Sequence, residues 1–366
     1  MQLSTAPIRA IPTRAAVTVV ALATAASVLA GCSDSSTDAP VTRAAPITST
    51  TQIATAGVLG NGRRPDESCA PEPAALDEGP ATREVRHAAG VSAVPADPQR
   101  IVALSDEALD TLCALGLQSR IVGAAISDGT AGQPSYLGTV IRNVPAVGAQ
   151  AKPDLAAIKA ATPDLILGSQ AVTGEGYGAL SAIAPTVFTG APGAAWRDNL
   201  HLVGTAVGRG QAAGGLVDGF ADAATKVGAQ TDAAHFQVSV VQLTETTMRI
   251  WGTADFPGSV LAAIGADRPG PQRFSDKPYH EIDISQLTPS TDFSTADGDI
   301  VYVSFDSAAA KSRAATLLDG PQWKKLSATR DHRVFVVNNE VWHTGGGIVA
   351  ARGMLDDLHW LNAPIN

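Results

Sequence analysis

Short apolar strands alternate with amphipathic helices after the first hundred residues, and this alternation limits the fold more than any other feature. The segment RIVALSDEALDTLCALGLQSRIVG predicts a buried strand over 101–104, a helix over 106–115 and a second strand over 121–124. The segment KPDLAAIKAATPDLILGSQ predicts a further helix and strand over 154–168. Strands and helices in this order indicate a parallel sheet covered by helices on both faces.

A stretch without strand signals separates two such alternating regions. Over 196–228 apolar residues recur at helical spacing, which predicts one connecting helix with a bend near Gly208. The alternation resumes in FQVSVVQL, TMRIWG, DIVYVSF and HRVFVV, and ends with a helix over 348–361. We therefore expect an α/β fold of two lobes with parallel-rich sheets flanked by helices, joined by a single long connecting helix, with a cleft between the lobes. The predicted lobes cover 99–195 and 229–366.

The first 31 residues have the features of an export signal. An arginine-containing start without acidic residues precedes an apolar run over 15–30, which is shorter than the roughly 20 residues of a membrane-spanning helix. The run ends in LAGC, which resembles the lipobox of bacterial lipoproteins and predicts acylation of Cys32. Cleavage without lipidation is the alternative.

Residues 32–98 are rich in Ser, Thr, Ala, Pro and Asp, which predicts a lipidated tether and N-terminal extension.

Charge and cysteine content restrict the partners and the compartment. The formal net charge of -9 argues against nucleic-acid binding, because phosphate backbones are repelled. Apart from Cys32, the chain contains Cys69 and Cys113, and an exported pair of cysteines favours a disulfide. The alternative is that Cys113 is a small core residue on its predicted helix.

Several segments together resemble one family of transport proteins. RIVALSDEALDTLCALGLQSRIVG, VPAVGAQAKPDLAAIKAATPDLILGS, GDIVYVSF and RVFVVNNEVWHTGGGIVAARGMLDDL are similar, in order and spacing, to the substrate-binding proteins of ABC importers for ferric siderophores, haem and cobalamin. The FecB-type iron-siderophore lipoproteins are the most similar group, and TQIATAGVLGNGRRPDESC adds to that likeness. The resemblance implies two lobes, a rigid connecting helix, a shallow interlobe cleft and little hinge closure. It also implies a monomer, lipid-anchored to the outer face of the cytoplasmic membrane, that captures a ferric siderophore for iron uptake.

Candidate ligand contacts follow from the rule that two-lobed α/β proteins bind ligands beyond the carboxyl ends of their strands. Aromatic side chains there would supply contact area to an iron chelate, and cations would suit an anionic one. The predicted ligand-binding residues are Ser105, Asp106, Gln170, Tyr177, Trp196, Arg249, Trp251, Arg273, Tyr279, Phe305, Asp306 and Trp342, with Lys277 as a further cation. For each tryptophan the alternative is a position in a lobe core, and for each cation the alternative is the solvated surface.

Haem is the alternative ligand, with Tyr177, Tyr279, His280 or His343 as candidate iron ligands. The histidines do not pair at the spacing of a zinc-binding helix, and no serine completes a nucleophile elbow. We therefore expect a binding protein, not an enzyme, with no resident metal or cofactor.

Docking on an ABC permease is the point where the chain departs from the family pattern. The family has a glutamate in each lobe that contacts a permease arginine, but Ala156 and Gln286 stand at the matching positions. Asp154, Glu281 or Asp283 could substitute. The two replacements leave open a second class of function, an envelope scaffold or interaction protein that has lost permease docking.

Overall fold

A computed structural model describes residues 52–173 and 176–362, so the predicted signal and Cys32 lie outside the described residues. Its first sheet has five strands in the order β7-β6-β5-β8-β9, and all neighbouring strands are parallel. The strands are β5 (Ile101–Ala103), β6 (Ile121–Ile126), β7 (Ala146–Ala149), β8 (Leu165–Ser169) and β9 (Thr186–Thr189). This sheet confirms the parallel arrangement predicted from the alternating pattern.

The second sheet has seven strands in the order β1-β2-β14-β13-β10-β11-β12. Its centre is parallel, because β2, β14, β13 and β10 run in one direction, whereas β1, β11 and β12 pair antiparallel with their neighbours. The strands are β1 (Gln52–Ile53), β2 (Ala56–Val58), β10 (Val238–Leu243), β11 (Thr247–Trp251), β12 (Tyr279–Asp283), β13 (Ile300–Phe305) and β14 (Val334–Val336). A separate antiparallel hairpin consists of β3 (Thr82–His87) and β4 (Gly90–Pro95).

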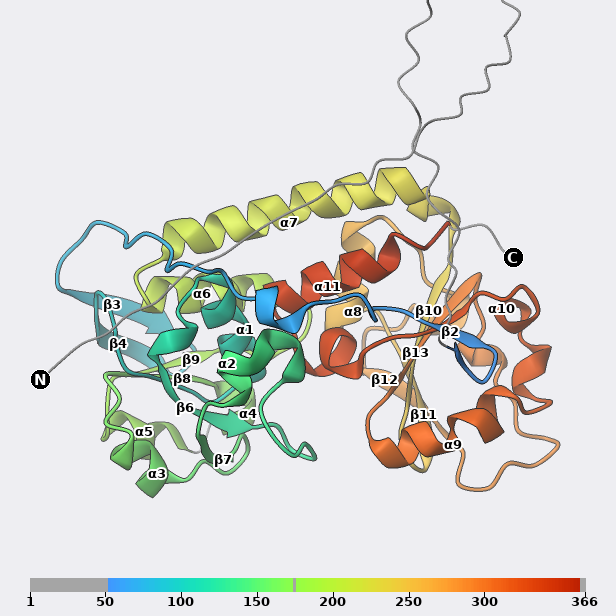
Figure 1. Ribbon diagram of the computed structural model, residues 1–366, viewed down its shortest axis with the longest axis horizontal. Helices are drawn as coiled ribbons and strands as arrows, with labels where there is room; N and C mark the ends of the chain where they lie inside the picture. Colours follow the sequence, from blue (N-terminus) through green and yellow to red (C-terminus); the bar gives the residue numbers. More distant parts are fainter. Residues whose placement is uncertain (1–51, 174–175, 363–366) are drawn as a thin grey trace, which may run out of the picture. The chain divides into compact units, whose positions relative to one another are not determined.

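The N-terminal segment belongs to the folded body from its first described residue. Strand β2 pairs with β14 in the sheet of the second half (Figure 1). The next two strands in the sequence, β3 and β4, form the separate hairpin. Arg63 then connects the segment to the last helix through an ion pair with Asp357 (2.5 Å) and a hydrogen bond to the Gly353 carbonyl (2.6 Å). The predicted end of the tether and N-terminal extension at residue 98 therefore does not mark where the folded body begins.

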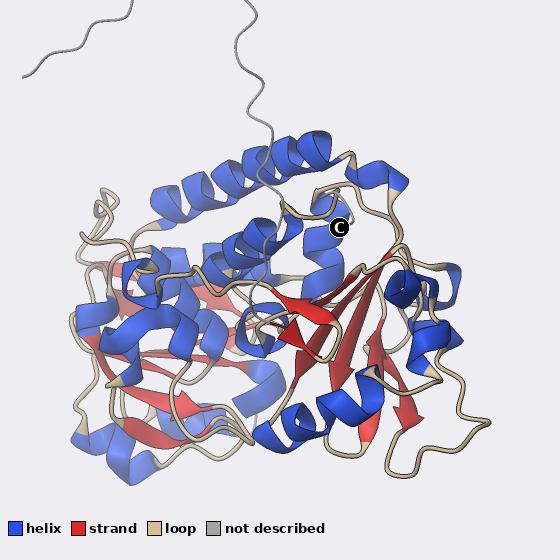
Figure 2. Cartoon of the chain, turned by 45° about the vertical axis from the view of Figure 1, so that its right-hand side comes forward, coloured by secondary structure: helices blue, strands red, loops and turns tan. Residues whose placement is uncertain are grey.

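Helices cover both faces of each sheet (Figure 2). They are α1 (Asp106–Ala114), α2 (Gly138–Arg142), α3 (Leu155–Ala160), α4 (Gln170–Thr173), α5 (Tyr177–Ser181), α6 (Trp196–Ala206), α7 (Gly210–Thr231), α8 (Phe256–Ala263), α9 (Ala308–Leu318), α10 (Ser327–Arg330) and α11 (Ile348–Leu358). Among the described residues, no helix has both the length and the apolar character that crossing a membrane requires. One apolar core contains Leu112 of α1, Phe220 of α7 and Tyr302 of β13, so the two halves share a core.

Two helices, not one, occupy the predicted connecting segment over 196–228. Helix α6 ends just before Gly208, which has a left-handed φ of 70°, and α7 begins two residues later. The helices pack so closely that a Cβ at Gly204 would lie 2.4 Å from the Cβ of Ala213. The chain thus reverses at the predicted bend, and α7, with 22 residues and a length of about 33 Å, passes from the first half to the second (Figure 1).

A buried carboxylate of the first half binds the N-terminus of the last helix. Asp110 of α1 is fully buried and accepts hydrogen bonds from the N–H groups of Val349 (2.8 Å) and Ala350 (3.0 Å) in α11. The hydroxyl of Tyr136 also donates to Asp110 (2.8 Å). Burial raises the pKa of Asp110 to about 6, while the positive end of the helix dipole favours the charged form. This contact fixes α11 to the first half.

A disulfide joins Cys69 to Cys113, as predicted, across 44 residues of sequence. Cys113 lies on α1 and is fully buried. The bond therefore attaches the N-terminal segment to the helix that also holds α11.

We predict that replacing both Cys69 and Cys113 with alanine lowers the free energy of unfolding by about 2–4 kcal/mol, because the unfolded chain regains the entropy of an open loop. Urea denaturation of the parent and variant, with and without reductant, measures the difference. Reductant should destabilise only the parent. Ready alkylation of both thiols in the folded, unreduced parent would contradict the disulfide.

Candidate binding cleft

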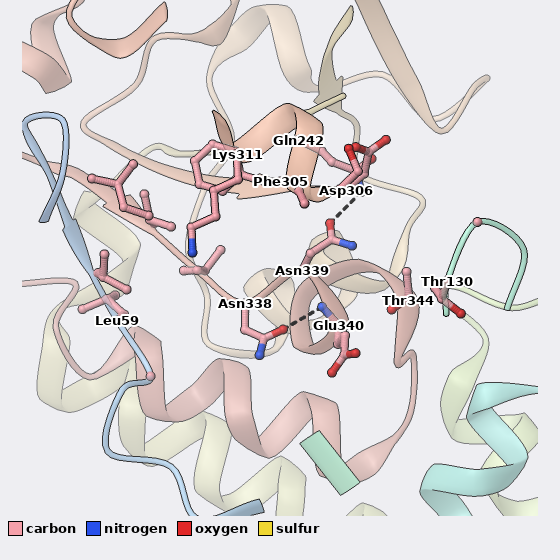
Figure 3. A pocket seen from close by; sticks show the side chains of 18 of the residues that line it. Leu59, Thr130, Gln242, Phe305, Asp306, Lys311, Asn338, Asn339, Glu340 and Thr344 are labelled. Carbon is pink, nitrogen blue, oxygen red and sulfur yellow. Dashed lines mark hydrogen bonds between the residues drawn. The ribbon is translucent and has the colours of Figure 1, made fainter. Parts of the chain in front are cut away.

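A cavity of about 870 Å³ lies at the carboxyl ends of the parallel strands of the second sheet (Figure 3). Four segments supply most of its lining, 58–61 after β2, 305–308 after β13, 336–340 after β14 and 128–130 after β6. The first three segments belong to the seven-stranded sheet, and the fourth comes from the five-stranded sheet. The cavity is therefore a cleft between the two halves, at the edge where α/β sheets bind ligands.

Carboxamide groups form one wall of the cleft. Gln242, only 4% exposed, donates from Nε2 to Oδ1 of Asn339 (2.7 Å). Oδ1 of Asn338 accepts from the backbone N–H of Glu340 (2.8 Å), and both bonds are visible in Figure 3. These contacts orient the two asparagine side chains and engage their oxygen atoms, which leaves their NH₂ groups for a ligand.

Two cations line the cleft, but one of them is already paired. Nε of Arg249 lies 2.9 Å from the carboxylate of Glu281, and its guanidinium group lies 4.8 Å from the ring centre of Tyr279. The hydrogen bond from Arg249 lowers the pKa of Glu281, so this carboxylate stays charged beside the guanidinium. Lys311, on α9, has no ion-pair partner among the described residues.

Acidic side chains line the cleft as well. Asp128 and Asp306 are exposed, and neither carboxylate forms an ion pair within the described part of the chain. Glu340 differs, because its carboxylate crosses to the other half and accepts from the backbone N–H groups of Ser135 (2.9 Å) and Tyr136 (3.2 Å). Glu340 therefore holds the two walls of the cleft together.

Asp106, predicted as a ligand contact, lies behind the cleft and positions one of its loops. Its carboxylate accepts from Oγ of Ser127 and from Nε2 of Gln150 (3.0 Å). Burial raises the pKa of Asp106 to about 7. Because Ser127 directly precedes the lining loop 128–130, Asp106 acts on that loop through hydrogen bonds and does not line the cavity.

Three of the predicted contacts, Arg249, Phe305 and Asp306, line the cavity. Among the others, Ser105 caps α1 by accepting from the Ala108 N–H (3.3 Å). Gln170 and Tyr177 lie on α4 and α5 of the first half, away from this lining.

Two predicted cations also lie elsewhere. Arg273 pairs with Asp267, and the amino group of Lys277 lies 5.4 Å from the ring centre of Phe274. Neither side chain lines the cleft. Both residues are exposed, which corresponds to the solvated-surface alternative.

Two predicted tryptophan contacts are core residues. Trp196 is 1% exposed, and its Nε1 donates to Oγ of Ser259 (3.0 Å). Trp342 is fully buried, stacks on Tyr302 with ring centres 4.6 Å apart, and donates from Nε1 to Asp357 (2.8 Å). These contacts correspond to the lobe-core alternative.

Trp251 lies beside the cleft but does not line it. It ends β11, and β11 runs antiparallel to β10, so its carboxyl end points away from the edge where the parallel strands end. Its ring packs against Tyr279 and His343, with centres 5.2 and 4.8 Å apart. Of these rings, that of Tyr279 contacts Arg249, which does line the cavity.

None of the candidate haem ligands lines the cavity. Tyr177 contacts Oγ of Ser92 (3.2 Å), Tyr279 packs on Trp251, and His280 is exposed on β12. Both ring nitrogens of His343 are buried without a hydrogen-bond partner among the described residues. Burial, with nearby arginines, lowers the pKa of His343 to about 3, so the imidazole is neutral. The described residues contain no cluster of three or more potential metal ligands.

Most of the polar lining residues were not predicted from the sequence. Gln242, Lys311, Asn338, Asn339 and Glu340 line the cleft but were not proposed from the sequence. The segment VVNNEVW did contain a signal, since β14 ends at Val336 and the asparagines are the first polar residues beyond it. The N-terminal lining over 58–61 had no comparable signal.

Comparison with known proteins agrees with this architecture. Residues 101–341 match the periplasmic binding protein family, and the chain belongs to that family. A probable siderophore-binding lipoprotein of Bacillus subtilis, YfiY, is 35% identical over 292 residues, which cover 76% of this chain and 86% of that protein. An achromobactin-binding periplasmic protein of Dickeya dadantii is 29% identical over 71% of this chain and 85% of its own length.

The fold is also similar to that of a solved binding protein. Staphylococcus aureus SirA in complex with staphyloferrin B matches with a TM-score of 0.66 and 25% identity, over 78% of this chain and all of that one. The family and these relatives consist of binding proteins, in agreement with the predicted class. The likeness extends over both halves and therefore includes the cleft between them.

We predict that Trp342→Ala destabilises the protein by about 3–5 kcal/mol, because it leaves a cavity and removes the donor to Asp357. Trp251→Ala is the matched control, since this indole is only partly buried and should cost less than half as much. Urea denaturation measures both. Equal stability of the Trp342→Ala variant and the parent would contradict the core position.

Proposed function

We propose that this protein captures a ferric siderophore in the cleft lined by 58–61, 128–130, 305–308 and 336–340, and delivers it for iron uptake. The observation that supports this most strongly is the cavity of about 870 Å³ at the carboxyl edge of the second sheet, a size suited to a small-molecule ligand. The relatives named above, which bind siderophores or achromobactin, support the choice of ligand class.

Calorimetric titration of the protein with several ferric siderophores and with haem tests the proposal. We expect saturation at micromolar or lower concentration by at least one ferric siderophore. Saturation by haem alone would favour the haem alternative. Failure of every ligand to bind would contradict the proposal and favour a scaffold role.

We predict that Phe305→Ala weakens binding of that siderophore by about tenfold, because the half-buried ring supplies apolar contact area to the cleft. Phe236→Ala is the matched control, since this ring is also half-buried but lies before the amino end of β10, against Arg333 (4.8 Å). Equal losses of affinity in the two variants would contradict the assignment of Phe305 to the site.

We also propose that the protein is anchored by lipid at Cys32, on the basis of the LAGC sequence and the lipoprotein relative. Cys32→Ala should move the protein from the membrane fraction to the soluble fraction and remove the lipid mass from its N-terminal peptide. An unlipidated N-terminal peptide in the parent protein would contradict the anchor.

We propose that the protein docks only weakly on an ABC permease. Ala156 and Gln286 are exposed, and the nearby acids are engaged. Asp154 caps α3 by accepting from the Ala156 N–H (2.9 Å), Glu281 pairs with Arg249, and Asp283 accepts from the Ser285 N–H (2.7 Å). Interface charge pairs mainly steer association and fix register, so their loss weakens docking without affecting the cleft.

The ATPase activity of a reconstituted siderophore permease tests this proposal. We expect little stimulation by the ligand-loaded parent protein and clear stimulation by the double variant Ala156→Glu/Gln286→Glu. Full stimulation by the parent would contradict the proposed loss of docking.

A further inference from the structure

We infer that the cleft selects ferric chelates whose net charge is zero or positive and discriminates against highly anionic ones. The inference rests on the function proposed above and adds the charge class of the ligand. It follows from the charged side chains that line the cavity and from the partners that each of them already has.

The formal charge of the lining is negative. It contains two cations, Arg249 and Lys311, and three acids, Asp128, Asp306 and Glu340, which give a net charge of -1. A cleft with an acidic excess raises the local concentration of cations and repels anions, because field lines are focused between its walls. The lining therefore opposes a trianion and tolerates a neutral ligand.

The acidic excess remains when only the unpaired side chains of the lining are counted. Nε of Arg249 lies 2.9 Å from the carboxylate of Glu281 on β12. This carboxylate therefore balances much of the positive charge of Arg249. Asp128 and Asp306 have no such partner among the described residues. Lys311 is then the one lining cation without an ion pair in the part of the chain that the structure describes, whereas two lining carboxylates, those of Asp128 and Asp306, are unpaired there.

The uncharged part of the lining indicates which hydrogen-bonding groups a neutral ligand would need. The NH₂ groups of Asn338 and Asn339 are directed by the bonds to Glu340 N–H and Gln242, and they can donate to carbonyl oxygen atoms. Hydroxamates present such oxygens, and three of them, each losing one proton, balance the charge of Fe³⁺. Three catecholates, each losing two protons, leave the complex with a charge of 3−. The cleft suits the first chemistry.

Calorimetric titration of the full chain with a neutral ferric tris-hydroxamate and a trianionic ferric tris-catecholate tests the inference. At about 0.15 M salt we expect the neutral chelate to bind at least about tenfold more tightly. The ratio should fall when salt is raised to about 1 M, because screening weakens the repulsion of the trianion.

Variants locate the selectivity in the cleft. The double variant Asp128→Asn/Asp306→Asn should lower the affinity ratio by about tenfold, and Lys311→Gln should raise it. Asp218→Asn/Asp222→Asn, on the exposed face of α7, removes the same charge away from the cleft and should leave the ratio unchanged.

The outcomes separate this inference from the proposed function. Equal or tighter binding of the trianion, with the neutral chelate also bound, would overturn the charge selectivity and leave siderophore capture standing. A ratio that responds equally to the α7 control would likewise overturn it, because the effect would then come from net charge alone. Absence of binding by every ferric chelate would overturn both.

Discussion

The buried carboxylate of Asp110 is the contact on which the arrangement of the two halves depends. It lies on α1, in the first half, and accepts hydrogen bonds from two N–H groups at the start of α11, in the second. An unpaired charge at this depth would be costly, but the N-terminus of a helix supplies donors and a favourable dipole. The contact is supported by the apolar core that both halves share and by the disulfide at Cys113 on the same helix.

The shape of the cleft depends on the contact between α1 and α11. Glu340 follows β14 and is hydrogen-bonded to Ser135 and Tyr136 of the first half, while Tyr136 also donates to Asp110. One chain of hydrogen bonds thus runs from the core of the junction to the lining of the cavity. The hydrogen bonds of Glu340 join the two walls within the protein. A ligand would therefore meet walls that are already connected, and its affinity would depend mainly on the chemistry of the lining.

The sequence predicted the elements with strong local patterns and missed those without them. β5, β8 and β10 are buried along their whole length, and β13 is buried except at Phe305. Their mainly apolar sequences are typical of strands that helices cover on both faces. β1 and β2 have two and three residues, too few for any periodicity, and only their pairing with β14 makes them strands. The reversal at Gly208 also depends on tertiary packing, because α6 and α7 meet through Gly204 and Ala213.

The same limits apply to the site. The strand-end rule led to Phe305 and Asp306 because β13 is parallel to its neighbours. It failed for Trp251 because β11 is antiparallel to β10, and strand direction within a sheet is a property of pairing that one sequence does not reveal. The rule also predicted Trp342, but this residue lies further from the end of β14 than Asn338 and Asn339 and packs into the core.

Siderophore capture in the cleft, as proposed, requires iron to bind between the ends of β10, β13 and β14 and the loop after β6. A crystal structure of the protein with its ferric chelate, with iron located by anomalous scattering, tests it most directly. We expect an iron peak in the cavity lined by Asp128, Phe305 and Asn339. A peak beside Lys152 and Gln170, or beside Arg64 and Arg352, would contradict it.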